Sequence, residues 1–211
     1  MNRSVLPATA GVAAVLSLAA VVVAMHAIQP QLGPATHFVS EYAYGQFGWL
    51  VSLAYVVAGA GVLALASSVG SALSGRWSTA SAVCVVLAGM GIIATGLTRI
   101  DVVQSDGSIV STESGMAHEL AGYVVLLGLV PGAFLLSGAF SRDPRLAAVA
   151  FASRVFAWGL IATFVVAVIS QGMGLAGAGQ RVFLGTWLSW LVFVGLQVRA
   201  LGRQSRPRGG S

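Results

Sequence analysis

The chain has 211 residues, of which 57% are hydrophobic and only 8% are charged, and its formal net charge is +5. A soluble domain of this composition would lack the polar side chains needed to cover its surface, so we exclude a soluble globular fold. The basic balance would suit nucleic-acid binding, but the charges flank apolar stretches of membrane-spanning length, so we expect no nucleic-acid partner.

Six apolar stretches are each long enough to cross a bilayer as a helix, because about 20 helical residues span a hydrocarbon core of roughly 30 Å. They do not alternate as barrel strands do, so the predicted fold is an all-α integral membrane bundle of six transmembrane helices. The domain covers residues 1–200, with spans at 7–28, 47–69, 79–98, 118–140, 154–172 and 182–200. Residues 201–211 are predicted to form a basic, disordered cytoplasmic tail.

The first span follows Arg3 and therefore has the charge pattern of a signal peptide. Its apolar part is too long for one, and Met25 and His26 stand where the small residues of a cleavage site would be. We therefore expect an uncleaved first helix.

Arginine sets the expected orientation, since the chain contains no lysine. Nine of the eleven arginines flank the spans on the side of both termini, and only Arg99 and Arg181 map to the opposite side. Positive charge concentrates in cytoplasmic loops, so we expect both termini in the cytoplasm and a location in the plasma membrane.

Acidic side chains gather on the other side, at the predicted extracytoplasmic rim. Five of the six acidic residues map there: Glu41, Asp101, Asp106, Glu113 and Glu119. Acidic residues contribute little to membrane orientation, so the arginine rule does not account for this asymmetry. Asp106 and Glu113 fit a solvated loop, whereas the other three belong to a candidate polar site.

The segment from Thr36 to Trp49 is the first patch of this site. If a short interfacial helix begins near Thr36, His37 and Glu41 lie at i and i+4 on one of its faces. Aromatic side chains, including Tyr42, suit anchoring at headgroup depth. The alternative is a surface helix whose histidine and glutamate form an ion pair without further function.

Two further patches close the third span and open the fourth. Arg99 and Asp101 follow the third span so closely that we expect them to pair with each other or with other helices. His118 and Glu119 open the fourth span, where the helix dipole favours the glutamate. His118 is either a structural hydrogen-bonding group or a ligand-binding residue.

Arg181 precedes the sixth span, on the side where arginine is disfavoured and near a helix N-terminus, where the dipole also disfavours it. Such an arginine is expected to have an acidic partner or an anionic ligand. The candidate partners are Glu41, Asp101 and Glu119, and Gln180 stands beside it.

Four of these segments carry a resemblance: SEYAYGQFGWL, TGLTRID, His118, and the glycine-rich run that ends in Gln180 and Arg181. In this order they resemble the bacterial and archaeal six-helix membrane family named domain of unknown function 998. The resemblance implies a multi-pass fold and brings no established reaction. The family's aromatic-proline ending of the third span is replaced here by Leu97-Thr98-Arg99 before Asp101.

Several functions remain open, and whether the protein is an enzyme stays undecided. In one, the rim charges hold the bundle together, and the rim binds a membrane lipid or isoprenoid. In another, an enzyme acts on such a lipid, with Asp101 or Glu41 as acid or base and His118 as proton relay. The expected substrate- or anion-binding residues are Arg99, Arg181, Gln180, Glu119 and His37.

No cofactor is expected, although two alternatives use the same histidines. A zinc-like ion would use His37, Glu41 and His118, with Asp101 as a further ligand, but their spacing matches no metal signature. A haem would need His26 or His37 opposite His118. A transporter is disfavoured because no clear charged residue falls at the midplane of a span.

Small-residue spacings favour close helix packing within the bundle. They occur at Gly59-Ala60-Gly61, at Gly89 and Gly91, and at Gly172 and Gly174. Cys84 is the single cysteine and supports neither a disulfide nor a thiolate metal site.

Overall fold

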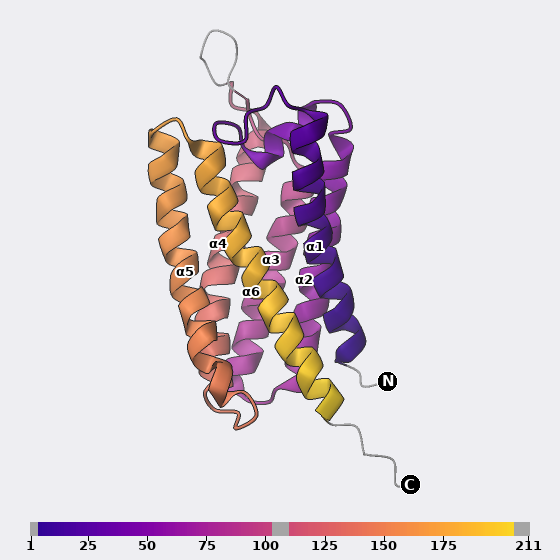
Figure 1. The fold of residues 1–211 in the computed structure, drawn as a ribbon, viewed down its shortest axis with the longest axis vertical. Coiled ribbons are helices and arrows are strands. Elements are labelled where there is room, and N and C mark those ends of the chain that lie inside the picture. Colours follow the sequence, from indigo (N-terminus) through magenta and orange to yellow (C-terminus); the bar gives the residue numbers. More distant parts are fainter. Residues whose placement is uncertain (1–3, 103–109, 205–211) are drawn as a thin grey trace.

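The computed structural model describes residues 4–102 and 110–204, and all regular elements in these residues are helical. Six long helices run side by side along the long axis of the molecule (Figure 1). They are α1 (Val5–Ile28), α2 (Trp49–Ala72), α3 (Arg76–Leu97), α4 (Glu113–Phe140), α5 (Ala147–Gly172) and α6 (Ala176–Gln204), with a short 3-10 helix, η1 (Val39–Tyr44), between α1 and α2.

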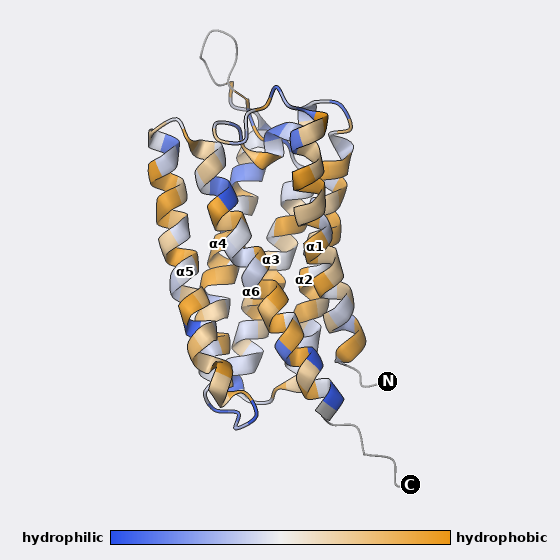
Figure 2. Ribbon diagram, viewed as in Figure 1, coloured by the Kyte–Doolittle hydropathy of each residue, from blue (hydrophilic) through white to orange (hydrophobic). Residues whose placement is uncertain are grey.

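All six long helices are long and apolar enough to cross a membrane, so the predicted all-α class with six spans is confirmed. The hydrophilic residues, blue in the ribbon, concentrate toward the two ends of the bundle (Figure 2). We expected the last helix to end at residue 200, but α6 continues to Gln204, and Leu201 is buried. Asp106 and the predicted tail from residue 205 onward lie outside the described residues.

The helices form a closed ring in chain order, in which α6 packs against both α5 and α1. α1 begins and α6 ends at the same end of the bundle, which we call the terminal end, and the opposite end is the distal end (Figure 1). The loops after α1, α3 and α5 therefore meet at the distal end. This arrangement brings the predicted rim residues to one end of the molecule.

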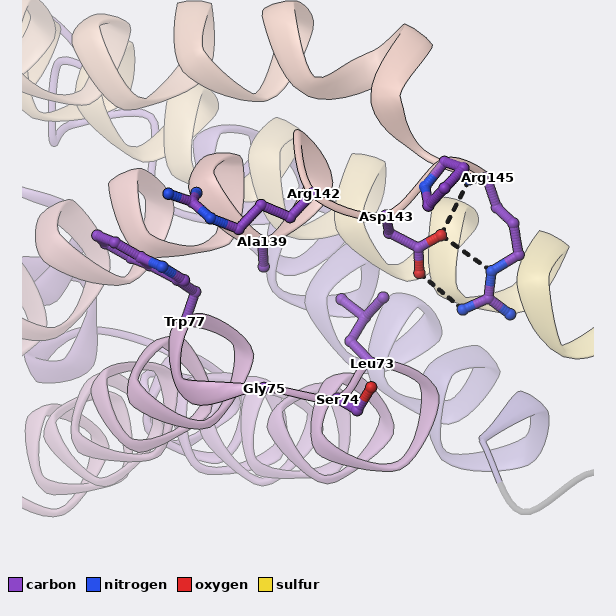
Figure 3. Close-up of a pocket in the computed structure, with 9 residues that line it drawn as sticks. Leu73, Ser74, Gly75, Trp77, Ala139, Arg142, Asp143 and Arg145 are labelled. Carbon is purple, nitrogen blue, oxygen red and sulfur yellow. Dashed lines mark hydrogen bonds and ion pairs between the residues drawn. The ribbon is translucent and has the colours of Figure 1, made fainter.

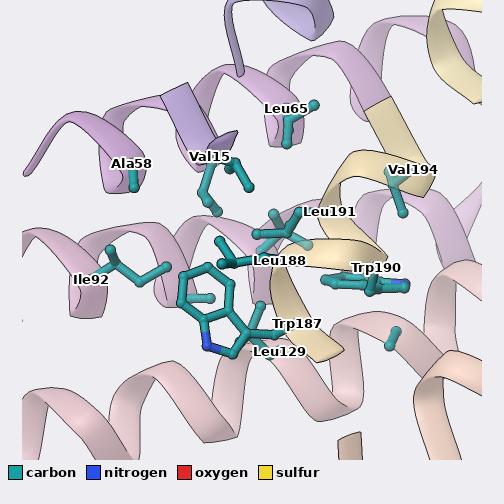
Figure 4. Close-up of a cluster of buried hydrophobic side chains, with 14 of the residues drawn as sticks. Val15, Ala58, Leu65, Ile92, Leu129, Trp187, Leu188, Trp190, Leu191 and Val194 are labelled. Carbon is teal, nitrogen blue, oxygen red and sulfur yellow. The ribbon is translucent and has the colours of Figure 1, made fainter. Parts of the chain in front are cut away.

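Side chains of α6 fill the middle of the ring. Trp190 and Leu191 are almost completely buried and lie among Val15 of α1, Leu65 of α2 and residues of α3 and α4 (Figure 4). α5 contributes least to the core, since only 17% of its apolar window is buried. It is therefore the helix with most of its surface open to lipid.

Glycines allow close approach between neighbouring helices. A Cβ atom on Gly59 of α2 would lie 2.7 Å from the carbonyl oxygen of Gly89 of α3, so both helices need glycine there. The expected packing role of Gly172 and Gly174 was wrong, because an added Cβ at either position meets open space. Gly174 instead adopts φ +74° in the turn before α6, a conformation that glycine accommodates without strain.

Candidate functional site

The loop between α1 and α2 covers the distal end of the bundle, and we call residues 30–48 the cap segment. We expected a helix from about Thr36, but the regular part is the 3-10 helix η1, from Val39 to Tyr44. Val39 and Tyr42 of this helix are fully buried. The cap segment is therefore packed into the bundle and does not merely lie on the membrane surface.

Arg181, in the first turns of α6, binds the cap segment to α1. Its Nε donates to Nε2 of His26 at 3.1 Å, and its Nη2 donates to the hydroxyl of Tyr42 at 3.2 Å. Its Nη1 donates to two backbone carbonyl oxygens, of His37 at 2.8 Å and of Gly177 at 3.0 Å. The guanidinium carbon also lies 5.7 Å from the centre of the Tyr42 ring.

The expected acidic partner of Arg181 was wrong. In the part of the chain that the structure describes, Arg181 forms no ion pair with Glu41, Asp101 or Glu119. Neutral acceptors satisfy the guanidinium because α6 approaches the cap segment closely: a Cβ atom on Gly177 would collide with the carbonyl oxygen of His37. Glycine at this position thus gives Arg181 access to backbone oxygens.

Two glutamines hold the same segment. Gln29, completely buried at the end of α1, donates through Nε2 to the carbonyl oxygens of Tyr42 at 2.8 Å and Gln46 at 2.9 Å. The Gln180 side-chain oxygen accepts from the backbone N–H of Val39 at 2.7 Å. Gln29 is not among the predicted site residues, although an amide directly after an apolar helix and before Pro30 is a sequence signal for such a contact.

Asp101 stabilises the start of α4. Its carboxylate accepts from the hydroxyl of Thr112 at 2.7 Å and from the backbone N–H of Thr112 at 3.2 Å. Thr112 in turn caps the helix by accepting from the backbone N–H of Gly115. An added Cβ on Gly115 would collide with the Asp101 carboxylate, so the carboxylate sits directly against the first turn, where the helix dipole favours negative charge.

Arg99, just after the end of α3, and His118, in α4, lie in the two segments that Asp101 connects, but each has its own partners. The backbone N–H of Arg99 donates to the hydroxyl of Ser114, and its guanidinium carbon lies 5.4 Å from the centre of the Tyr44 ring. His118 is buried, and its Nδ1 lies 3.3 Å from the carbonyl oxygen of Thr98 at the end of α3. Both residues join the end of α3 to neighbouring segments.

The cap segment keeps its own polar groups occupied locally. Glu41 accepts from the backbone N–H of Phe38 at 2.8 Å, and His37 Nδ1 lies 2.9 Å from the hydroxyl of Thr36. The alternative ion pair between Glu41 and His37 is not formed in the described residues. The Tyr44 hydroxyl donates to the carbonyl oxygen of Ile100 at 2.5 Å and so connects the cap segment to the end of α3.

A groove opens at the distal end between α4, α5 and α6, and we call it the distal groove. Its volume is about 310 Å³. Apolar side chains form most of its wall, including Tyr123, Phe164 and Phe183, and its polar residues are Glu119, Gln171 and Gln180. Glu119 is exposed and makes no hydrogen bond or ion pair with another described residue.

The predicted site residues thus gather at one end but form separate groups. Arg181 and Gln180 meet the cap segment, Asp101 and His118 join α3 to α4, and Glu119 faces the distal groove. The ligand set of the metal alternative, which includes His37 and His118, is divided among these groups, and no cluster of three or more His, Cys, Asp or Glu is found in the described residues. His26, one of the histidines of the haem alternative, accepts a hydrogen bond from Arg181 through Nε2.

Comparison with protein families gives a match over most of the chain. The family described as "Protein of unknown function (DUF998)" matches residues 12–197. No curated protein and no solved structure matches the chain. The chain belongs to this family, as the motifs at the distal end indicated.

Proposed function

We propose that this member of the DUF998 family binds a membrane lipid or isoprenoid in the distal groove. The observation that carries the proposal is a groove with mostly apolar walls whose polar residues, Gln171, Gln180 and Glu119, come from the distal ends of three different helices. Such a groove matches the two parts of a lipid, because hydrocarbon favours the apolar wall and a headgroup requires hydrogen-bonding partners.

The distal groove has room for one lipid headgroup and the first part of its hydrocarbon chain. Its volume of about 310 Å³ is at the lower end of the range for small-molecule sites, which is about 300–1,000 Å³. A smaller cavity of about 110 Å³ shares Gly122, Gln180 and Phe183 with the groove and leads toward Trp187 in the bundle. The rest of a lipid chain would lie along the exposed apolar face of α5.

The charge of the groove favours a headgroup without net negative charge. Glu119 would repel a diphosphate, and the guanidinium of Arg181 is engaged with His26, Tyr42 and the cap backbone. Amide and carboxylate groups suit a hydroxyl- or ammonium-bearing head instead. We propose such a lipid as the ligand.

The candidate acid–base residues already have hydrogen-bond partners within the protein, and this favours lipid binding over catalysis. Asp101 and Glu41 both accept backbone N–H groups, and His118 contacts Thr98. A general acid or base must reach the proton that it transfers. The distal groove is lined by none of these three residues.

Filling the groove tests the proposal. Gly122 lines it, and an added Cβ there meets open space, so Gly122→Leu occupies the groove without a backbone collision. Gly185→Leu is the matched control, because Gly185 is also exposed and unobstructed but lies outside the groove.

Lipids that copurify with each variant are measured by mass spectrometry. We expect Gly122→Leu to lose a lipid that the wild type and Gly185→Leu retain. Equal lipid content in both variants would refute binding in the groove, and a retained lipid with an anionic head would refute the headgroup assignment. Both variants should remain folded, since leucine favours helix over glycine by roughly 0.5–1 kcal/mol.

We also propose that the protein resides in the plasma membrane with both termini in the cytoplasm. The support is the arginine distribution, with nine of eleven arginines on the side of the termini. Reporter fusions at each terminus test the orientation, and a periplasmic or external signal from either would contradict it.

A further inference from the structure

A separate cavity lies at the terminal end, between the loop that joins α2 to α3 and the loop that joins α4 to α5 (Figure 3). Its volume is about 390 Å³. Trp77, Arg142, Asp143 and Arg145 line it, and we call it the terminal cavity. It shares no residue with the distal groove, so a ligand in the terminal cavity is independent of the proposed function.

Asp143 and Arg145 neutralise each other in this cavity. Arg145 donates through Nε to Oδ1 at 3.0 Å and through Nη2 to Oδ2 at 2.7 Å, and its backbone N–H also donates to Oδ1. The hydrogen bonds from the Arg145 guanidinium hold the pKa of Asp143 below its ordinary value. The carboxylate is therefore charged at neutral pH and already paired.

Among the described residues, Arg142 has no anionic partner. Its guanidinium carbon lies 4.6 Å from the centre of the Trp77 ring, and its Nη1 donates to the carbonyl oxygen of Gly138 at 2.7 Å. The guanidinium carbon of Arg76 lies 5.6 Å from the same ring. Within residues 4–102 and 110–204, neither arginine forms an ion pair. Two positive charges thus share one indole beside an open cavity.

We propose that the terminal cavity binds a phosphate group, with Arg142 as the principal contact. An arginine fork matches phosphate oxygens in a two-bond geometry, and charge-assisted hydrogen bonds are among the stronger ones in proteins. Trp77 suits the headgroup region, where tryptophan is enriched.

Two sources of phosphate fit this position. One is the headgroup of an anionic phospholipid, since basic pockets between transmembrane helices on the cytoplasmic side, where the proposed orientation places this end, are typical headgroup sites. The other is free phosphate from the aqueous phase. Both offer the same oxygens to Arg142, so the experiment must separate them.

Arg154 provides the matched control for general electrostatic attraction. It lies at the same end, in α5, is exposed, and does not line the cavity. A basic residue near a surface of anionic lipid contributes about fivefold to binding wherever it stands. A phosphate site requires Arg142→Gln to weaken binding by roughly tenfold or more beyond the effect of Arg154→Gln, because hydrogen bonds to a charged group are lost.

The experiment uses the full chain in nanodiscs of phosphatidylcholine with and without phosphatidylglycerol. Native mass spectrometry counts bound phosphatidylglycerol, and titration with inorganic phosphate tests competition. We expect retained phosphatidylglycerol in the wild type and in Arg154→Gln, and loss in Arg142→Gln. Asp143→Asn should bind more tightly than the wild type, because it removes the carboxylate that occupies Arg145.

The binding of the two probes decides whether the terminal cavity is a phosphate site and which source of phosphate it takes. Binding of inorganic phosphate that depends on Arg142, without selection for phosphatidylglycerol, would support the cavity and assign it to soluble phosphate. Equal effects of Arg142→Gln and Arg154→Gln, or no binding of either probe, would overturn the proposal. If Arg142→Gln unfolds, Asp143→Asn decides in its place, because it frees the Arg145 guanidinium, and binding no tighter than that of the wild type would equally overturn the proposal.

Discussion

Replacing Gly128 by alanine tests how closely α3 and α4 pack. A Cβ atom at Gly128 would lie 2.6 Å from the backbone nitrogen of Ala88 and 2.6 Å from the carbonyl oxygen of Cys84. Both atoms belong to helix backbone and cannot rotate away, so the helices must separate until the contact reaches about 3.5 Å. Overpacking of this kind costs about 1–3 kcal/mol.

Gly122→Ala is the control on the same helix, because its added Cβ meets open space. Both substitutions gain the same helix propensity, about 0.8–1.0 kcal/mol, so the difference between them isolates the packing term. Thermal unfolding in one detergent, followed by the helical circular dichroism signal, should place Gly128→Ala below Gly122→Ala by roughly 2–12 °C. Equal unfolding temperatures would refute the close backbone contact at Gly128.

Three other substitutions test the polar contacts. Arg181→Gln should lower the free energy of unfolding by about 1.5–3 kcal/mol, and Tyr42→Phe should lower it by about 1 kcal/mol. Equal losses for the two variants in a denaturant titration would contradict a central role for the arginine. Asp101→Ala should lower the free energy of unfolding by about 0.5–2 kcal/mol, and Asp101→Asn by less, since the asparagine oxygen still accepts a hydrogen bond from Thr112. Faster amide hydrogen exchange at the start of α4 would reveal the loss. The lowered pKa of Asp143 means that its pair with Arg145 stabilises the fold above the unfolded pKa of about 3.9, by about 0.2–1 kcal/mol. This stabilisation is lost as the pH falls through the lowered pKa of the folded protein, so Arg145→Gln should melt below the wild type by more at pH 7 than at pH 2.

Hydropathy identified the helices, because an apolar segment in lipid must hydrogen-bond its backbone N–H and C=O groups within itself and therefore forms a helix. Hydropathy located the ends of the helices less well. We expected the fifth span to begin at Arg154, yet α5 begins at Ala147. The residues from Ala147 to Ser153 are mostly apolar and continue the same helix. Arg154 therefore lies within the helix and does not mark its start, because a long arginine side chain can reach the headgroups from inside a helix.

The sequence also indicated which residues would gather at the distal end, because alternate loops of a bundle share one side. It could not identify the partners of Arg181. Two of them are the carbonyl oxygens of His37 and Gly177, which every residue possesses and which carry no sequence signal. The other two, His26 and Tyr42, depend on the rotation of α1 and on how the cap segment folds.

The arginines at the two ends of the bundle differ in the hydrogen-bond donors that remain free, and we therefore propose different ligands for the two ends. A guanidinium has five N–H donors. Arg181 makes four hydrogen bonds with described residues, whereas the guanidinium of Arg142 makes one. An anion that approached Arg181 would have to displace the cap segment, but one that entered the terminal cavity would meet donors already available. This difference supports the two proposals, of an uncharged or zwitterionic head in the distal groove and of phosphate in the terminal cavity.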